Sequence, residues 1–178
     1  MQRRQFLFTL SGLSLAWATR SFADAVSSNE KVAVMKFSDD GKMLGRATLP
    51  KVHKDAEWKA RLSPLAYQVT RQQGTERAFS QPGHDRHEPG IYRCVCCDNA
   101  LFDAKTKYDS RTGWPSFWQP IAVANVREIA DHMLGMTRTE VQCTLCDAHL
   151  GHVFDDGPKP TGLRYCMNTV ALRFIPHK

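Results

Sequence analysis

Apolar and polar positions follow a strand-like pattern over the second half of the chain. Beyond Gly90, short segments rich in Val, Ile, Tyr, Phe and Leu are separated by turn signals every several residues. Large apolar side chains stand at every second position over residues 141–145 and 170–174, and no long helical period occurs there. We therefore expect a mainly β fold, a compact antiparallel domain with one or two short helices at its N-terminal edge.

The pattern before residue 90 contains one clear helix start. Ser63-Pro64 supplies a capping serine and a first-turn proline, and an apolar face follows over residues 65–69. We expect Gly74 to end this helix. Residues 26–56 show little pattern apart from a short strand-like run at 32–34, and we interpret them as a linker or edge extension.

The first 25 residues have the parts of an export signal. Arg3 and Arg4 form a charged start, residues 6–18 a moderately apolar run, and Ala23-Asp24-Ala25 a cleavage site of the A-x-A type. The paired arginines followed by Phe-Leu resemble a twin-arginine signal. The apolar run falls short of the roughly 20 residues that span a bilayer, so we expect export to the bacterial periplasm without a membrane anchor. An amphipathic N-terminal helix is the alternative.

Charge and length restrict the class of partner. The formal net charge is +6, and it falls to +4 when residues 1–25 are left out. This mild, scattered excess is not the basic stripe of a nucleic-acid-binding domain, so we expect no nucleic-acid partner. With 178 residues, 42% of them hydrophobic, the chain suits one globular domain with an extension.

Six cysteines carry the strongest local signal. The pairs Cys94/Cys97 and Cys143/Cys146 have the C-x-x-C spacing at which a tight turn aims two thiolates at one tetrahedral metal ion. Four such sulfurs predict one structural zinc ion that joins two distant hairpins. Three disulfides are the alternative for an exported chain. Cys96 is then a partly buried thiol or, alternatively, a redox partner.

Cys166 lies outside both pairs, in the stretch GLRYCMNT. In a strand, Arg164, Cys166 and Asn168 share one face, where the arginine lowers the thiol pKa and the asparagine donates a hydrogen bond. His149 and His152 can supply proton donors to the same site. Packing remains the alternative role for the cysteine, and core, loop or zinc-ligand roles remain for the histidines.

Several motifs together resemble one enzyme family. Gly113-Trp114-Pro115-Ser116-Phe117 is followed by C-x-x-C-x-x-H-L-G-H-V-F-x-D-G-P at 143–158 and by P-T-G-x-R-Y-C-x-N at 160–168, with G-T-E-R at 74–77 and G-I-Y-R-C at 90–94 upstream. In this order and spacing they resemble the methionine-R-sulfoxide reductase family over residues from about 58 to 174. The resemblance makes residues 57–178 a catalytic domain of two antiparallel sheets, with the structural zinc on the side away from the active site.

The resemblance also implies a mechanism. Cys166 is the nucleophile that attacks the sulfoxide sulfur and takes its oxygen as a sulfenic acid, which releases methionine. The residues that match the family's polar pocket are His149, His152, Asp156, Arg164 and Asn168. Trp114 and Phe154 match its substrate-binding positions, the tryptophan as a wall for the substrate methyl group, with an ordinary core tryptophan as the alternative. The implied substrates are oxidised proteins or free methionine sulfoxide.

One position departs from a common pattern of the family. Many members carry a resolving cysteine just before Gly-Trp-Pro-Ser-Phe, where this chain has Arg111-Thr112. We expect an external, thioredoxin-like thiol to reduce the sulfenic acid, with Cys96 as the alternative resolving thiol. We also expect a monomer. The rival classes are a zinc-containing binding module without chemistry and a zinc-dependent nucleic-acid binder.

Overall fold

The computed structural model describes residues 30–132 and 137–177. The expected export signal at 1–25 lies outside the described residues. None of the helices in the described part is both long and apolar enough to cross a membrane.

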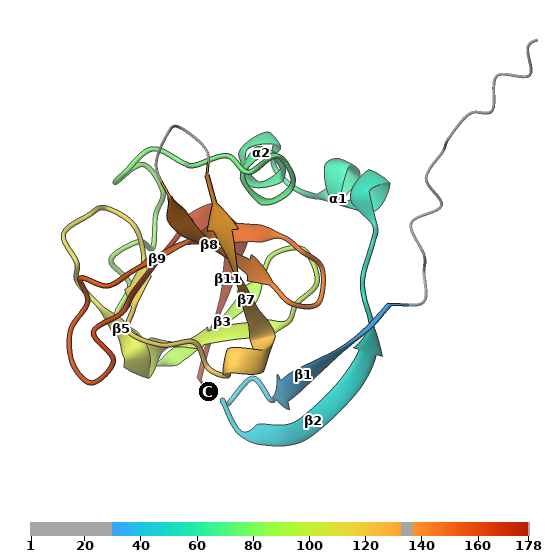
Figure 1. Ribbon diagram of the computed structural model, residues 1–178, viewed down its shortest axis with the longest axis horizontal. Coiled ribbons are helices and arrows are strands. Elements are labelled where there is room, and N and C mark those ends of the chain that lie inside the picture. Colours follow the sequence, from blue (N-terminus) through green and yellow to red (C-terminus); the bar gives the residue numbers. More distant parts are fainter. Residues whose placement is uncertain (1–29, 133–136, 178) are drawn as a thin grey trace, which may run out of the picture.

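The largest sheet has six strands in the order β5-β6-β10-β9-β8-β7, and all neighbours in it are antiparallel (Figure 1). Its strands are β5 (Lys107–Tyr108), β6 (Ser116–Phe117), β7 (Val126–Asp131), β8 (Arg138–Cys143), β9 (His149–Phe154) and β10 (Arg164–Met167). β10 lies between β6 and β9, so two segments that are distant from each other in the sequence flank it.

A second sheet packs against the first through aromatic side chains. It contains β3 (Gly90–Cys94), β4 (Ala100–Asp103) and β11 (Leu172–Pro176) in the order β11-β3-β4. Phe102 of β4 stacks on Phe117 of β6 with ring centroids 4.4 Å apart, and Tyr92 of β3 meets the same ring edge-on at 5.0 Å. Each fully buried aromatic side chain contributes about 2 kcal/mol, so this layer holds the two sheets together.

The segment that the sequence pattern left as a linker or edge extension contains a β-hairpin. Its strands are β1 (Lys31–Phe37) and β2 (Met43–Pro50), which form a separate two-stranded sheet, drawn in blue and cyan in Figure 1. The buried Asn125 ties the hairpin to the body: its side chain accepts from Met35 N at 2.7 Å and donates to Met35 O at 2.8 Å. The strand-like run at 32–34 lies within β1, but the contact of Met35 with Asn125, 90 residues away, leaves no local signal in the sequence.

Within the described residues, two short helices lie between the hairpin and the strands of the two larger sheets, α1 (Asp55–Arg61) and α2 (Pro64–Gln72). The expected cap is confirmed, because the Ser63 hydroxyl accepts a hydrogen bond from Ala66 N at 3.1 Å. The left-handed residue that ends α2 is Gln73 with φ 54°, one residue before the expected Gly74. The part of the chain that the structure describes also contains the 3₁₀ turns η1 (Ala104–Thr106), η2 (Val123–Asn125) and η4 (Thr169–Ala171).

The mainly β prediction with antiparallel sheets and two helices is confirmed, but two alternating runs are shorter than expected. β8 ends at Cys143, so Leu145 lies in the following turn, and η4 occupies residues 169–171 before β11 begins at Leu172. β8 ends at Cys143 because the C-x-x-C segment that begins there forms a tight turn, and a turn cannot keep the extended conformation of a strand.

Candidate active site and metal centre

Two matching turns bring four cysteine sulfurs together. In one turn Asp98 N donates to Cys94 O at 2.9 Å, and in the other Asp147 N donates to Cys143 O at 2.9 Å. Both aspartates adopt the left-handed conformation, with φ 67° and 55°. This repeated backbone geometry aims both thiols of each turn to one side, as the C-x-x-C spacing predicts.

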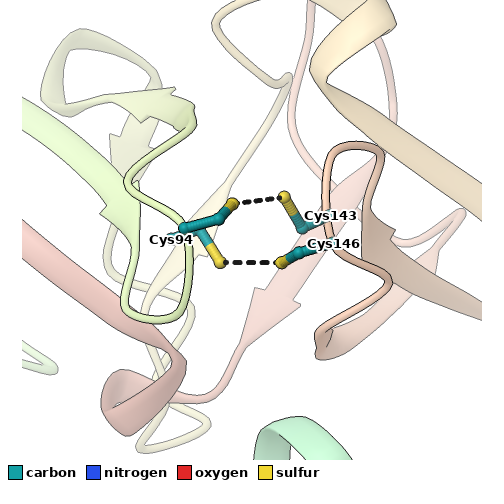
Figure 2. A group of neighbouring side chains, drawn as sticks. Cys94, Cys143 and Cys146 are labelled. Carbon is teal, nitrogen blue, oxygen red and sulfur yellow. Dashed lines mark hydrogen bonds between the residues drawn. The ribbon is translucent and has the colours of Figure 1, made fainter. Parts of the chain in front are cut away.

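The four thiols of Cys94, Cys97, Cys143 and Cys146 lie within 4.8 Å of one another. Figure 2 shows Cys94 facing Cys143 and Cys146 across the gap between the two turns, with Sγ of Cys94 3.7 Å from Sγ of Cys146. Zinc–sulfur bonds of about 2.3 Å place tetrahedral sulfurs about 3.8 Å apart, so this cluster fits Zn²⁺. All six cysteines are free thiols, which excludes the three-disulfide alternative in this structure.

Cys166 lies on β10, apart from the metal cluster. It pairs with Ser116 on β6 and with His152 on β9, and its side chain is partly buried. A Cβ on Gly151 would come within 2.1 Å of Cys166 O, so only glycine allows β9 to approach the cysteine backbone this closely.

A cavity of about 150 Å³ opens beside Cys166. Its lining residues are Thr75, Trp114, Arg138, Gly151, His152, Phe154, Cys166, Met167 and Asn168. The indole of Trp114 donates to Glu76 O at 3.2 Å, which anchors one wall of the cavity. Trp114 is only half-buried, so it is not an ordinary core tryptophan.

Burial of Cys166 raises the pKa of its thiol above the usual cysteine value. The Thr112 hydroxyl and the positive charge of Arg164 lower that pKa, but they only partly offset the burial. Arg164 lowers the pKa of Cys166, as expected from the sequence. Burial raises this pKa by more, so the thiol stays protonated in the resting protein. At neutral pH the sulfur carries its proton.

Arg164 and Asp156 form a two-pronged ion pair beside the cavity. Arg164 Nε and Nη2 donate to the two Asp156 carboxylate oxygens at 2.8 and 2.9 Å. The hydrogen bonds raise the pKa of Arg164 and lower that of Asp156. The same guanidinium lies over the Phe154 ring, 4.3 Å from its centroid, so the aromatic side chain and the ion pair hold each other in place.

His152 faces the cavity and is held by a carboxylate. Its Nε2 lies 2.9 Å from Asp131 Oδ2, and the same oxygen accepts a hydrogen bond from Arg138 at 2.7 Å. Burial lowers the pKa of His152, and the hydrogen bond to Asp131 opposes this only in part. A neutral imidazole therefore borders the Cys166 cavity at pH 7.

His149 lies one layer behind His152. Its ring is 5.4 Å from that of His152, and its Nδ1 is 2.6 Å from Glu140 Oε1, with both side chains buried. Burial acts to raise the pKa of Glu140, but the hydrogen bond from His149 helps to bring it below its ordinary value. His149 lines a neighbouring cavity of about 450 Å³ and does not line the Cys166 cavity.

Asn168 follows β10 and does not continue its alternation. The strand ends at Met167, and Asn168 turns into the buried interior. Its Oδ1 accepts from Glu76 N at 3.0 Å, and its Nδ2 donates to Leu150 O at 3.1 Å. These two bonds join the Asn168 amide to backbone atoms, and its donation to Cys166 stays a prediction. Asn168 lines the cavity and holds two backbone segments around it.

Comparison with known proteins identifies the domain. A family model described as the SelR domain matches residues 62–176. The peptide methionine sulfoxide reductase MsrB of Pseudomonas entomophila is 58% identical over 120 residues, which cover 67% of this chain and 92% of that protein. The chain belongs to the methionine-R-sulfoxide reductase family.

Two further methionine sulfoxide reductases show how the similarity is distributed. The MsrB protein of Thioalkalivibrio sulfidiphilus is 55% identical over 120 residues, covering 67% of this chain and 88% of the relative. The chloroplastic peptide methionine sulfoxide reductase B1 of Arabidopsis thaliana is 58% identical over 118 residues, covering 66% of this chain and 58% of the relative.

The methionine-R-sulfoxide reductase domain also contains site residues that sequence reasoning did not single out. The buried Glu76 accepts hydrogen bonds from Thr169 N at 2.7 Å and Val170 N at 3.0 Å, at the start of η4. Asp131 and Glu140 hold the two histidines. The G-T-E-R motif was a signal for Glu76, whereas the roles of Asp131 and Glu140 depend on pairing between β7, β8 and β9.

Proposed function

We propose that this protein reduces methionine-R-sulfoxide to methionine, in oxidised proteins and as the free amino acid, with Cys166 as the nucleophile. One observation carries the proposal: the Cys166 thiol lies outside the four-cysteine metal cluster and borders a small cavity between Trp114 and His152. A thiol in such a cavity can reach a sulfoxide sulfur, whereas none of the four clustered cysteines lines this cavity.

The protonation states of the site fit the reaction. The neutral thiol of Cys166 gives up one proton as its sulfur attacks, and the sulfoxide oxygen needs one proton as it leaves the substrate sulfur. His152 is neutral and borders the same cavity, so it can accept the thiol proton and pass it to that oxygen. The products are methionine and a Cys166 sulfenic acid, and no other reactant enters this step.

The cavity walls support selection between the two sulfoxide epimers. Trp114 and Phe154 provide apolar surface for the substrate methyl group, and His152 provides a polar group elsewhere on the cavity wall. An R-sulfoxide presents its oxygen to the polar group when its methyl lies on the aromatic surface. The S epimer, held by the same methyl contact, points its oxygen elsewhere.

An external thiol then reduces the sulfenic acid, in keeping with Thr112 at the position where many relatives carry a resolving cysteine. Cys96 is poorly suited to resolve it, because its thiol is buried and contacts Thr70 Oγ1 at 3.5 Å. Its carbonyl accepts a hydrogen bond from Trp58 Nε1 at 3.0 Å, which holds the backbone in place. We propose a thioredoxin-like dithiol as this reductant.

The four-cysteine cluster would hold one structural zinc ion. Cys94 ends β3 and Cys97 lies in the turn after it, while Cys143 ends β8 and Cys146 lies in the turn after that strand, so the ion would join the two main sheets. A closed set of four thiolates leaves no position for substrate, so the metal would supply stability and take no part in the reaction.

Export is a further part of the proposal. The charged start, apolar run and A-x-A site within residues 1–25 support transport to the periplasm by a twin-arginine route. The released chain would comprise the hairpin segment and the catalytic domain of residues 57–178, as a monomer. Cell fractionation of the full chain and of the Arg3→Lys, Arg4→Lys variant tests this. Equal periplasmic amounts of the two would contradict a twin-arginine route.

Turnover of the two epimers, measured side by side, tests the function. We expect reduction of dabsylated methionine-R-sulfoxide with dithiothreitol, negligible reduction of the S epimer, and no activity of Cys166→Ser with unchanged zinc content. Cys96→Ser is the matched cysteine control and should keep its activity. Binding of the R-sulfoxide by the native protein without any turnover would instead indicate a binding module.

A further inference from the structure

Three hydroxyl groups form a continuous chain that ends at the sulfur of Cys166. Ser116 Oγ lies 2.7 Å from Ser110 Oγ, and Ser110 Oγ lies 2.8 Å from Thr112 Oγ1. Thr112 Oγ1 in turn lies 3.9 Å from Cys166 Sγ. We refer to these three residues, Ser110, Thr112 and Ser116, as the hydroxyl relay.

The fold builds the relay from one strand and one turn. Ser116 on β6 is fully buried and is the register partner of Cys166 on β10. In the turn between β5 and β6, Arg111 adopts a left-handed conformation with φ 59°, and its N–H donates to Asp109 Oδ1 at 2.8 Å. This turn reverses the chain, so that Thr112 returns over the sulfur of Cys166.

Every hydroxyl of the relay can donate its hydrogen to an acceptor both when Cys166 is a thiol and when it is a thiolate. Each hydroxyl has one hydrogen to donate. With a thiolate, Ser116 donates to Ser110, Ser110 to Thr112, and Thr112 to the sulfur. With a thiol, Cys166 donates to Thr112, every bond reverses, and Ser116 donates to Trp114 O, which lies 3.3 Å away. No hydroxyl of the relay loses its acceptor in either state.

This reversal matters because Cys166 is partly buried. Burial opposes formation of the thiolate, and a hydrogen bond to a charged sulfur is stronger than one to a neutral sulfur. The relay can therefore favour the thiolate when it forms without destabilising the resting thiol. A valine at position 112 would keep the shape of the threonine and remove its hydroxyl, which is the end of the relay.

We propose that the hydroxyl relay is part of the catalytic site and that Thr112 donates a hydrogen bond to the Cys166 thiolate at two points of the cycle. This inference rests on the proposed function and deepens it. The first point is the attack of the thiolate on the sulfoxide sulfur. The second is the release of the same thiolate during reduction by external thiols.

The second point follows from the chemistry of regeneration. An external thiol attacks the Cys166 sulfenic acid, the S–O bond breaks, and water leaves as a mixed disulfide forms. A second external thiol attacks the outer sulfur of that disulfide, which releases Cys166 as a thiolate and forms an external disulfide. The two external thiols supply the two electrons, and a better stabilised leaving thiolate departs faster.

Alkylation of Cys166 in the full-length, zinc-loaded protein tests the relay without any sulfoxide. Iodoacetamide reacts with the thiolate, and mass spectrometry of the Cys166 peptide follows its reaction across pH. We expect Thr112→Val to move the midpoint of the pH profile upward by about one unit and to slow alkylation below it about tenfold. Thr112→Ser should restore the native profile, and Ser110→Ala should move it in the same direction by less.

A Thr112→Val profile equal to the native one would overturn the relay. Should Thr112→Val lose its zinc or its fold, the comparison of Ser110→Ala with the native protein decides in the same way. The assay also separates the two proposals, because it requires no turnover. A shifted profile in a protein that never reduces a sulfoxide would retain the relay and overturn the proposed function, and turnover with an unshifted profile would do the reverse.

Discussion

Arg164 holds Asp156 by two parallel hydrogen bonds, from Nε to Oδ1 and from Nη2 to Oδ2. Because this fork also lies over the Phe154 ring, the guanidinium has little freedom to turn toward or away from the neighbouring thiol. Arg164 and Cys166 are two residues apart on β10, so their side chains lie on the same face of the strand. The arginine therefore acts on the sulfur as a fixed positive charge.

Removing that charge should make the thiolate harder to form. Arg164→Gln is expected to raise the pKa of Cys166 further and to slow its alkylation at pH 7.5 roughly tenfold, since the positive charge lowers this pKa. Arg46→Gln removes the same charge from an exposed position of the hairpin and is the matched control. Alkylation of Arg164→Gln at the native rate would show that the charge does not reach the sulfur.

Loss of the metal is expected to lower the thermal stability of the fold, because the ion takes no part in the reaction at Cys166. Cys97→Ser leaves three thiolates around the ion, and we expect sub-stoichiometric zinc and a fall in Tm of roughly 10 °C or more. Cys96→Ser, one residue away, should bind one zinc ion per chain and melt near the native protein. Metal analysis and thermal unfolding of both variants check this. Full zinc content in Cys97→Ser would show that Cys97 is not a zinc ligand.

Among the residues that position the cavity, Glu76 is expected to cause the largest loss of folding free energy when it is replaced. Glu76→Ala leaves the N–H groups of Thr169 and Val170 without their acceptor in a partly buried position, which costs about 2 to 3 kcal/mol. Chemical denaturation measures this loss. Glu76→Gln keeps one acceptor oxygen and should lose about half as much. A loss under about 1 kcal/mol for the alanine variant would mean that water replaces the carboxylate.

Position 112 also allows the route of regeneration to be changed. The Thr112 hydroxyl lies 3.9 Å from Cys166 Sγ, so the thiol of the Thr112→Cys variant can reach the sulfenic acid and form a disulfide. After one turnover without reductant, we expect a disulfide-linked peptide that joins position 112 to Cys166 in this variant, and no such peptide in the native protein. A native protein that already forms an internal disulfide would contradict the external route.

The sequence predicted the parts of this molecule whose signals are local. Two C-x-x-C turns, each followed by an aspartate, need only their own residues to take shape, and they form the four-thiol cluster. The alternation of Arg164 and Cys166 is likewise a property of one strand, and both side chains lie on the half-exposed face of β10. Ser63-Pro64 begins a helix because the cap acts within one turn.

Properties that depend on distant segments were not predictable in this way. Asn168 was expected to follow the alternation of β10, but Glu76, 92 residues earlier, takes its side-chain oxygen. The charge of Arg164 was visible in the sequence, while the burial that outweighs it depends on β6 and β9, which flank Cys166 on β10. Local residues thus predict which groups are present, and long-range packing decides how each of them behaves.

The proposed reaction requires that Cys166 itself takes the sulfoxide oxygen. Native protein should be mixed with methionine-R-sulfoxide in the absence of reductant and then treated with dimedone, which traps sulfenic acids. We expect one equivalent of methionine and one dimedone adduct per chain, on the Cys166 peptide, by mass spectrometry. Formation of methionine with Cys166 unmodified, or with a Cys96–Cys166 disulfide in place of the adduct, would contradict the account.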